Sequence, residues 1–185
     1  MSDGPHRSLP MRSHWKDVAQ RAARPAFSPD QVCEALSHAL KRDILEAPIK
    51  AVRDILGSDT LFPEMRTEQL ESLRATCPGS ASATLVIDSA IEAACNGLMG
   101  DAGTRAALKS ALEGAELSAL RGIEEHSQRE MDPRSTRFVR DRLDAARKQL
   151  DCGALASELL APATPPAPRS VILPRQMGVE DGPEL

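Results

Sequence analysis

The stretch TRAALKSALEGAELSALRGI at residues 104–123 decides how this chain folds. Alanines recur in it at every fourth position, with leucines and an isoleucine beside them at helical spacing. Residues four apart lie on one face of an α-helix, and a face of small side chains lets a second helix approach closely. We therefore expect a long helix over about 104–131, with this face as a helix contact, either within the domain or between copies of the chain. The alanine row consists of Ala107, Ala111, Ala115 and Ala119.

The flanking sequence predicts further helices and no strand. Ser28-Pro29-Asp30-Gln31 combines a serine suited to cap a helix, a proline at the first helical position and a glutamine that can complete a capping box. Between residues 82 and 99 apolar side chains cover most of the helix circumference, so we place this helix at the centre of the bundle. The apolar spacing predicts helices over 28–44, 48–57, 65–77, 82–99, 104–131 and 133–150, and it allows a shorter one at 154–160.

These segments indicate an all-α fold, a single helical bundle of about five to seven helices with flexible N- and C-terminal tails. Residues 1–27 form a basic arm that prolines interrupt. The sequence allows a short helix at 13–23, but a solvated terminus is the state we expect for this arm. The bundle spans 28–161, and residues 162–185 form a proline-rich tail with polyproline character.

The chain carries no strong overall charge. Its 185 residues include 23 basic and 27 acidic side chains, which gives a formal charge of −4. No general field therefore draws the protein onto nucleic acid or an anionic membrane, and such binding needs a local patch. Its apolar runs fall short of the roughly 18 residues that span a bilayer. We expect a soluble, cytoplasmic protein, the alternative being one that is targeted or secreted through an unfolded N-terminal segment.

The four cysteines form no recognisable metal or redox motif. They contain no Cys-x-x-Cys pair, and no histidine stands at ligand spacing from them. We expect reduced, structural thiols, the alternative being two disulfides in a secreted protein. No metal and no cofactor is expected. The cysteines are Cys33, Cys77, Cys95 and Cys152.

Two groups of ionisable side chains lack the spacing that catalysis or metal binding requires. Asp88 and Glu92 lie one helical turn apart, but no histidine or further carboxylate accompanies them on that helix. Glu124-Glu125-His126 lacks the Glu-x-x-His spacing that places two ligands on one helical face. We assign no catalytic residue, and an enzyme is the class of function that the sequence supports least.

The helix expected at 133–150 carries a basic outer face. Such a face can follow the phosphates of a nucleic acid or bind an acidic protein. Asp141 and Asp144 share this face, four residues after Arg137 and Arg140 respectively. Ion pairs of about 0.3–0.5 kcal/mol each are therefore expected to neutralise part of it. The candidate contacts are Arg134, Arg137, Arg140 and Lys148.

The proline-rich tail contains an unusually apolar strip, Val171-Ile172-Leu173. This strip either folds back onto the bundle or serves as a docking peptide for another protein. The whole sequence predicts a non-enzymatic protein–protein interaction or regulatory module with a docking tail, a protein partner and a capacity to form homo-oligomers. One alternative is a small nucleic-acid-binding regulator that uses the basic arm and the face at 134–148. The other is a secreted or targeted effector.

Overall fold

The computed structural model describes residues 11–44, 48–77 and 80–161. These residues form eight α-helices and no strand, which confirms the all-α class. The helices exceed the expected number because two segments that the sequence only allowed, at 13–23 and near 154–160, both fold. The helices are α1 (Ser13–Ala23), α2 (Pro29–Ile44), α3 (Ile49–Leu56), α4 (Pro63–Thr76), α5 (Ala81–Cys95), α6 (Gly100–Glu130), α7 (Pro133–Gln149) and α8 (Cys152–Leu160).

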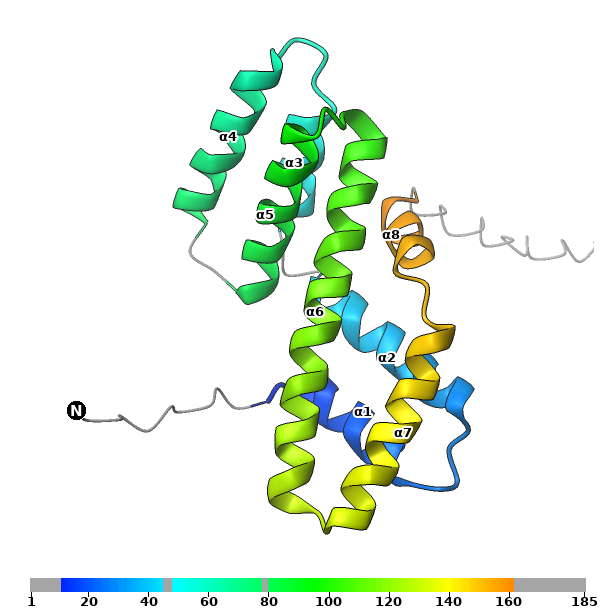
Figure 1. Cartoon of the computed structure of the whole chain (residues 1–185). Coiled ribbons are helices and arrows are strands. Elements are labelled where there is room, and N and C mark those ends of the chain that lie inside the picture. The colour runs from blue at the N-terminus through cyan, green and yellow to red at the C-terminus, as the bar shows by residue number, and fades with distance from the viewer. Residues whose placement is uncertain (1–10, 45–47, 78–79, 162–185) are drawn as a thin grey trace, which may run out of the picture.

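Helix α6 is the axis of the molecule. It contacts every other described helix except α4. In Figure 1, α3, α4 and α5 lie beside its first half, and α1, α2 and α7 lie beside its second half. Our placement of the helix at 82–99 at the centre is therefore wrong, because α6 holds that position, whereas α5 contacts only α2, α3, α4 and α6 among the described helices. The 31 residues of α6 extend over about 46 Å, which is long enough to reach both halves.

Local capping chemistry sets the start of α2, and a turn sets the start of α6. The Ser28 amide donates to Gln31 Oε1 at 2.8 Å, and the Gln31 amide donates to Ser28 Oγ at 3.3 Å, which confirms the capping box. Helix α6 begins at Gly100, earlier than the predicted residue 104. The turn lies upstream, where Gly97 and Gly100 adopt φ values of 73° and 62°, a region that suits glycine.

The expectation of a solvated arm over residues 1–27 is wrong for α1. Trp15 is 6% exposed, and Val18 and Ala22 are fully buried. These side chains form one helical stripe, and α1 packs with it against α2, α6 and α7. A tryptophan buries on the order of 200 Å² of surface, which favours docking of this helix over solvation. Residues 1–10 lie outside the described residues.

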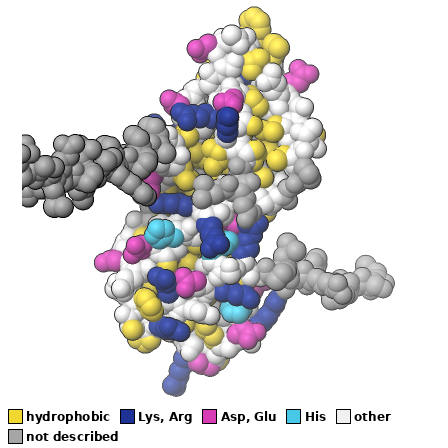
Figure 2. All heavy atoms as spheres, turned by 180° about the vertical axis from the view of Figure 1, so that it is seen from behind, with side chains coloured by type: hydrophobic (Ala, Val, Ile, Leu, Met, Phe, Trp, Pro, Cys, Tyr) yellow, Lys and Arg dark blue, Asp and Glu magenta, His cyan; other side chains and the backbone are white. Residues whose placement is uncertain are grey.

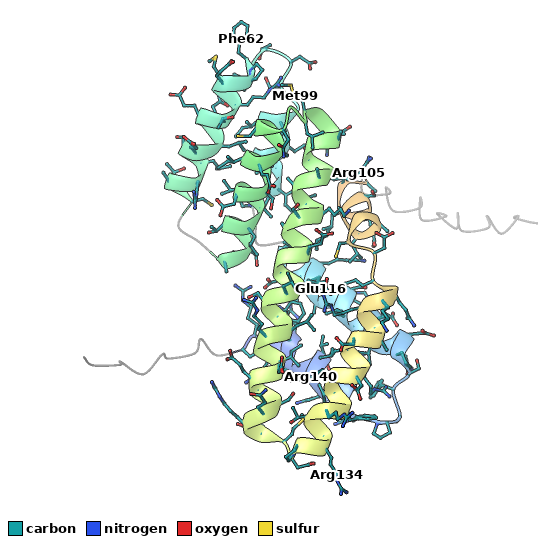
Figure 3. All side chains as sticks on the ribbon, in the orientation of Figure 1. Phe62, Met99, Arg105, Glu116, Arg134 and Arg140 are labelled. Atoms are coloured by element: carbon teal, nitrogen blue, oxygen red, sulfur yellow. The ribbon has the colours of Figure 1, made fainter. Side chains whose placement is uncertain are left out.

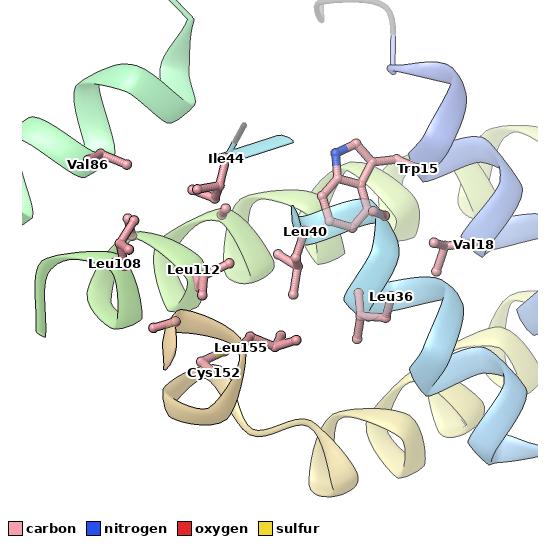
Figure 4. Close-up of a cluster of buried hydrophobic side chains, with 14 of the residues drawn as sticks. Trp15, Val18, Leu36, Leu40, Ile44, Val86, Leu108, Leu112, Cys152 and Leu155 are labelled. Carbon is pink, nitrogen blue, oxygen red and sulfur yellow. The ribbon is translucent and has the colours of Figure 1, made fainter. Parts of the chain in front are cut away.

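A single hydrophobic core runs through both halves. Figure 4 shows Trp15 and Leu36 in one half, Val86 in the other, and Leu112 of α6 between them. All four belong to one cluster of buried side chains. The halves are therefore joined by apolar packing along α6 as well as by the chain itself.

Candidate functional site

The alanine row packs inside the chain. Three of its members are buried and the fourth, Ala119, is partly buried. Helix α5 lies close to α6 along this stretch: a Cβ built on Gly114 would lie 3.2 Å from Leu85 Cδ2. Small side chains on α6 thus allow the backbones of α5 and α6 to lie close together. A contact of the alanine row between two copies of the chain stays a prediction.

At its C-terminal end the row borders an open cleft of about 650 Å³. Ala115, Ala119 and Gly122 line the α6 side, and Trp15 and Lys16 line the α1 side. The cleft exists because small residues on α6 leave space where larger ones would reach α1.

A mostly buried carboxylate joins three segments near this cleft. Asp43, at the end of α2, accepts hydrogen bonds from Arg12 Nη1 at 2.9 Å and from Ser82 Oγ at 2.6 Å. His14 Nε2 lies 3.5 Å from the same carboxylate. A serine nucleophile needs the imidazole as its hydrogen-bonded base, whereas Ser82 is bound here to the carboxylate itself. The arrangement therefore ties the start of α5 to α1 and α2.

A second buried carboxylate joins α6, α7 and α8. Glu116 is 7% exposed, and Figure 3 places it midway along α6. It accepts a hydrogen bond from Arg147 Nε, and Cys152 Sγ lies 3.9 Å from its Oε2 atom. Burial, together with this carboxylate, raises the pKa of the Cys152 thiol to about 11. A thiol that stays protonated is a poor nucleophile, so this cluster links helices rather than presenting a reactive cysteine.

The predicted basic contacts lie on the exposed side of α7. Arg140 forms an ion pair with Glu124 of α6 instead of the expected one with Asp144. Figure 3 shows Arg134 at one end of the molecule, pointing away from it. No ion pair along α7 itself is found among the described residues. The basic face of α7 consists of Arg134, Arg137, Arg140 and Lys148.

Exposed apolar side chains gather at the opposite end of the molecule, where the α3–α4 and α5–α6 connections meet. Phe62 is 70% exposed and Met65 is 44% exposed. Figure 3 shows Phe62 and Met99 at this end, and Figure 2 shows hydrophobic side chains there with acidic ones nearby. The apolar tip, as we name it, consists of Phe62, Met65, Leu98 and Met99.

A buried arginine holds the two connections of the tip together. Arg66 is 6% exposed, although it carries a charge. Its guanidinium donates to the Ser58 carbonyl oxygen in the α3–α4 connection and contacts Met99 Sδ in the α5–α6 connection. The exposed side chains of the tip are thus presented on a fixed base.

Acidic side chains begin beside the apolar tip and continue along α4. Three of them stand at i, i+4 and i+7 on α4 and so share one side of that helix, while the fourth lies in the α3–α4 connection. All four are exposed. The acidic rim consists of Asp59, Glu64, Glu68 and Glu71.

Sequence reasoning missed this surface. It used Met65 only as part of the apolar spacing of the helix at 65–77, and it counted Leu98 in the apolar circumference of the helix at 82–99. Helix α5 ends at Cys95, so Leu98 falls in the connection and is exposed. One signal was present in the sequence: Phe62 occupies the N-cap of α4, a position where polar side chains that bind the helix amides are preferred.

The docking strip Val171-Ile172-Leu173 lies outside the described residues. Within the described part of the chain, no group of three or more His, Cys, Asp or Glu side chains is placed to hold a metal ion. No helix in that part has the length and apolarity to cross a membrane. No family model, curated protein or solved structure matches this chain.

Proposed function

We propose that the protein is a non-enzymatic protein–protein interaction module that docks a basic, amphipathic segment of a partner protein on the apolar tip and acidic rim. The observation that carries the proposal is the position of both surfaces on or beside α4. This helix packs only against α3 and α5 among the described helices, so its outer side is open to a partner. An interaction module also agrees with the sequence, which assigns no catalytic residue.

The apolar tip favours a partner because exposed large apolar side chains gain from being covered. Complete burial of a phenylalanine or methionine side chain contributes about 1.5–3 kcal/mol relative to full exposure. Phe62 and Met65 belong to the same short segment, so one docking element can cover both. Contiguous exposed apolar side chains with a polar border are typical of interaction sites.

The acidic rim favours a partner of positive charge. Between residues 59 and 71 the chain carries four acidic side chains and one basic one, Arg66, which is buried beneath the tip. The exposed charge along this segment is therefore entirely negative. Complementary charges at the border of an interface accelerate association and discriminate against wrong partners.

The test uses two fluorescent synthetic helices, an amphipathic helix of leucine and lysine and the same helix with glutamate in place of lysine. We expect the lysine helix to bind the full chain in fluorescence anisotropy, with an affinity that falls as salt is added, and the glutamate helix not to bind. The double substitution Phe62→Ser and Met65→Ser should weaken binding by at least about tenfold, because two apolar contacts are lost. Substituting Glu64→Gln and Glu68→Gln should mainly reduce the salt dependence.

The matched control is Leu117→Ser, which removes an apolar side chain that is 50% exposed on α6, away from the tip. This variant should bind like the wild type. Equal binding of the two helices, or a tip variant that binds normally, would refute the proposal. If light scattering shows a wild-type dimer that the tip variant loses, the occupant of the tip is a second copy of the chain.

The alternative function, a nucleic-acid-binding regulator, would use the basic face of α7. Arg140 on this face is already engaged with Glu124 of α6, which reduces the charge available to phosphates. This engagement favours the protein partner over the nucleic acid.

A further inference from the structure

A second candidate binding site lies between α6 and α7, at the other end of the molecule from the apolar tip. The two helices border a partly open cavity of about 160 Å³. Its lining contains four apolar side chains, Leu120, Ile123, Val139 and Leu143. The charged side chains of Glu124, Arg140, Asp144 and Arg147 also border it. The ion pair of Glu124 with Arg140 stands at its exposed border.

Two hydroxyl groups, those of Ser127 and Thr136, line the cavity. Ser127 is 1% exposed, and its buried Oγ atom has no hydrogen-bond partner among the described residues. Thr136 Oγ1 donates its hydrogen to the Ser127 carbonyl oxygen at 3.0 Å. The Thr136 oxygen can therefore still accept a hydrogen bond, whereas the Ser127 hydroxyl can both donate and accept. Buried hydroxyl groups in proteins normally form hydrogen bonds, so we expect a hydrogen-bond partner for the Ser127 hydroxyl.

Two polar links join α6 and α7 on either side of the cavity. The hydrogen bond from Thr136 to the Ser127 carbonyl fixes α7 to α6 near the turn that joins them. The ion pair of Arg147 with Glu116 fixes the same helices farther along. These links fix the position of α7 on α6 on both sides of the cavity.

We propose that this cavity binds a small neutral molecule with one six-membered ring and one hydroxyl group, such as a simple phenol. A cavity of roughly 150 Å³ accommodates benzene, so the volume here matches a single ring, which the four apolar side chains can contact. The ligand hydroxyl donates to Thr136 Oγ1 and accepts from Ser127 Oγ, which gives the Ser127 hydroxyl a partner. The ring contacts the four apolar side chains. This site lies apart from the apolar tip and does not depend on the function proposed for it.

The test compares phenol with toluene, which has a similar size but no hydroxyl group. Both are titrated into the full chain while two-dimensional amide NMR spectra are recorded. We expect phenol to bind more tightly, with shift changes centred on α6 and α7. Ser127→Ala should weaken phenol binding by roughly two- to tenfold, as expected for one lost hydrogen bond, and leave toluene binding unchanged. The matched control is Ser110→Ala, which removes an exposed hydroxyl from the same helix.

Two further variants keep the test decisive. Leu120→Phe places a ring in the same space, so it should abolish binding of both compounds. If Ser127→Ala fails to fold, Thr136→Val removes the other hydroxyl with little change in shape and should reduce the preference for phenol. The proposal is overturned if neither compound shifts the α6 and α7 signals, or if phenol and toluene bind the wild type equally well.

Discussion

Alanine substitution of two glycines in α6 tests how closely the neighbouring helices pack. A glycine inside a helix costs about 0.8–1.0 kcal/mol relative to alanine, because its backbone loses more freedom on folding. Nothing lies within 4 Å of a Cβ built on Gly122. Gly122→Ala should therefore gain this whole amount and raise the melting temperature by about 2–4 °C for a chain of this length.

Gly114→Ala should stabilise the protein less. A Cβ at this position lies 3.2 Å from Leu85 Cδ2, so the end of the Leu85 side chain must move by a few tenths of an ångström. That shift offsets part of the gain in helix propensity. In a Leu85→Ala background the Leu85 side chain no longer occupies this space. Gly114→Ala should then raise the free energy of unfolding by the full amount of about 1 kcal/mol. The difference between the two backgrounds measures the steric cost of the α5–α6 contact.

Urea denaturation followed by circular dichroism gives the free energies of unfolding for this cycle, and light scattering checks that each variant keeps the oligomeric state of the wild type. A destabilising Gly122→Ala would show that the space beside this glycine is filled in the folded protein. Equal gains from Gly114→Ala with and without Leu85 would show that α5 does not approach α6 at this point. Either result would refute the packing described above.

Three further predictions concern a thiol, a charged surface and the tail. The alkylation rate of Cys152 should reach half its maximum near pH 11, and Glu116→Gln should lower this pH without restoring the ordinary value of 9.0, because burial is the larger cause. The pKa of the Cys152 thiol is 9.0 in the unfolded chain and about 11 in the folded protein, so the unfolded thiol loses its proton at a lower pH. The free energy of unfolding should therefore fall as the pH rises from 9.0 toward 11. Replacing the three arginines of the basic face of α7 with glutamine should hardly change retention on immobilised DNA near physiological salt; tight, salt-sensitive retention that the variant loses would support the nucleic-acid alternative. Deleting residues 162–185 should leave the melting temperature nearly unchanged but abolish the binding of a protein partner. The single substitution Ile172→Asp should abolish the same binding. A large loss of stability on deletion would instead place Val171-Ile172-Leu173 in the core.

Features that depend on neighbouring residues could be predicted from the sequence. The capping box at Ser28 forms because its two partners stand three positions apart, and such a contact needs no other part of the chain. The alanine row likewise follows from the period of the helix. Helix type, most helix boundaries and the all-α class therefore came from local spacing.

Tertiary structure decided which side of each helix is covered and by what. Trp15 is buried because α1 docks on helices far along the chain, and Met65 is exposed because no described helix covers that side of α4. The cavity beside Ser127 likewise depends on how far α7 stands from α6. The period of the apolar residues predicts that a helix has an apolar side. Which helix packs against that side depends on contacts between residues distant in sequence. For this reason the sequence determined the helices and their caps, while the apolar tip, the position of α1 and the α6–α7 cavity were set only when the helices packed together.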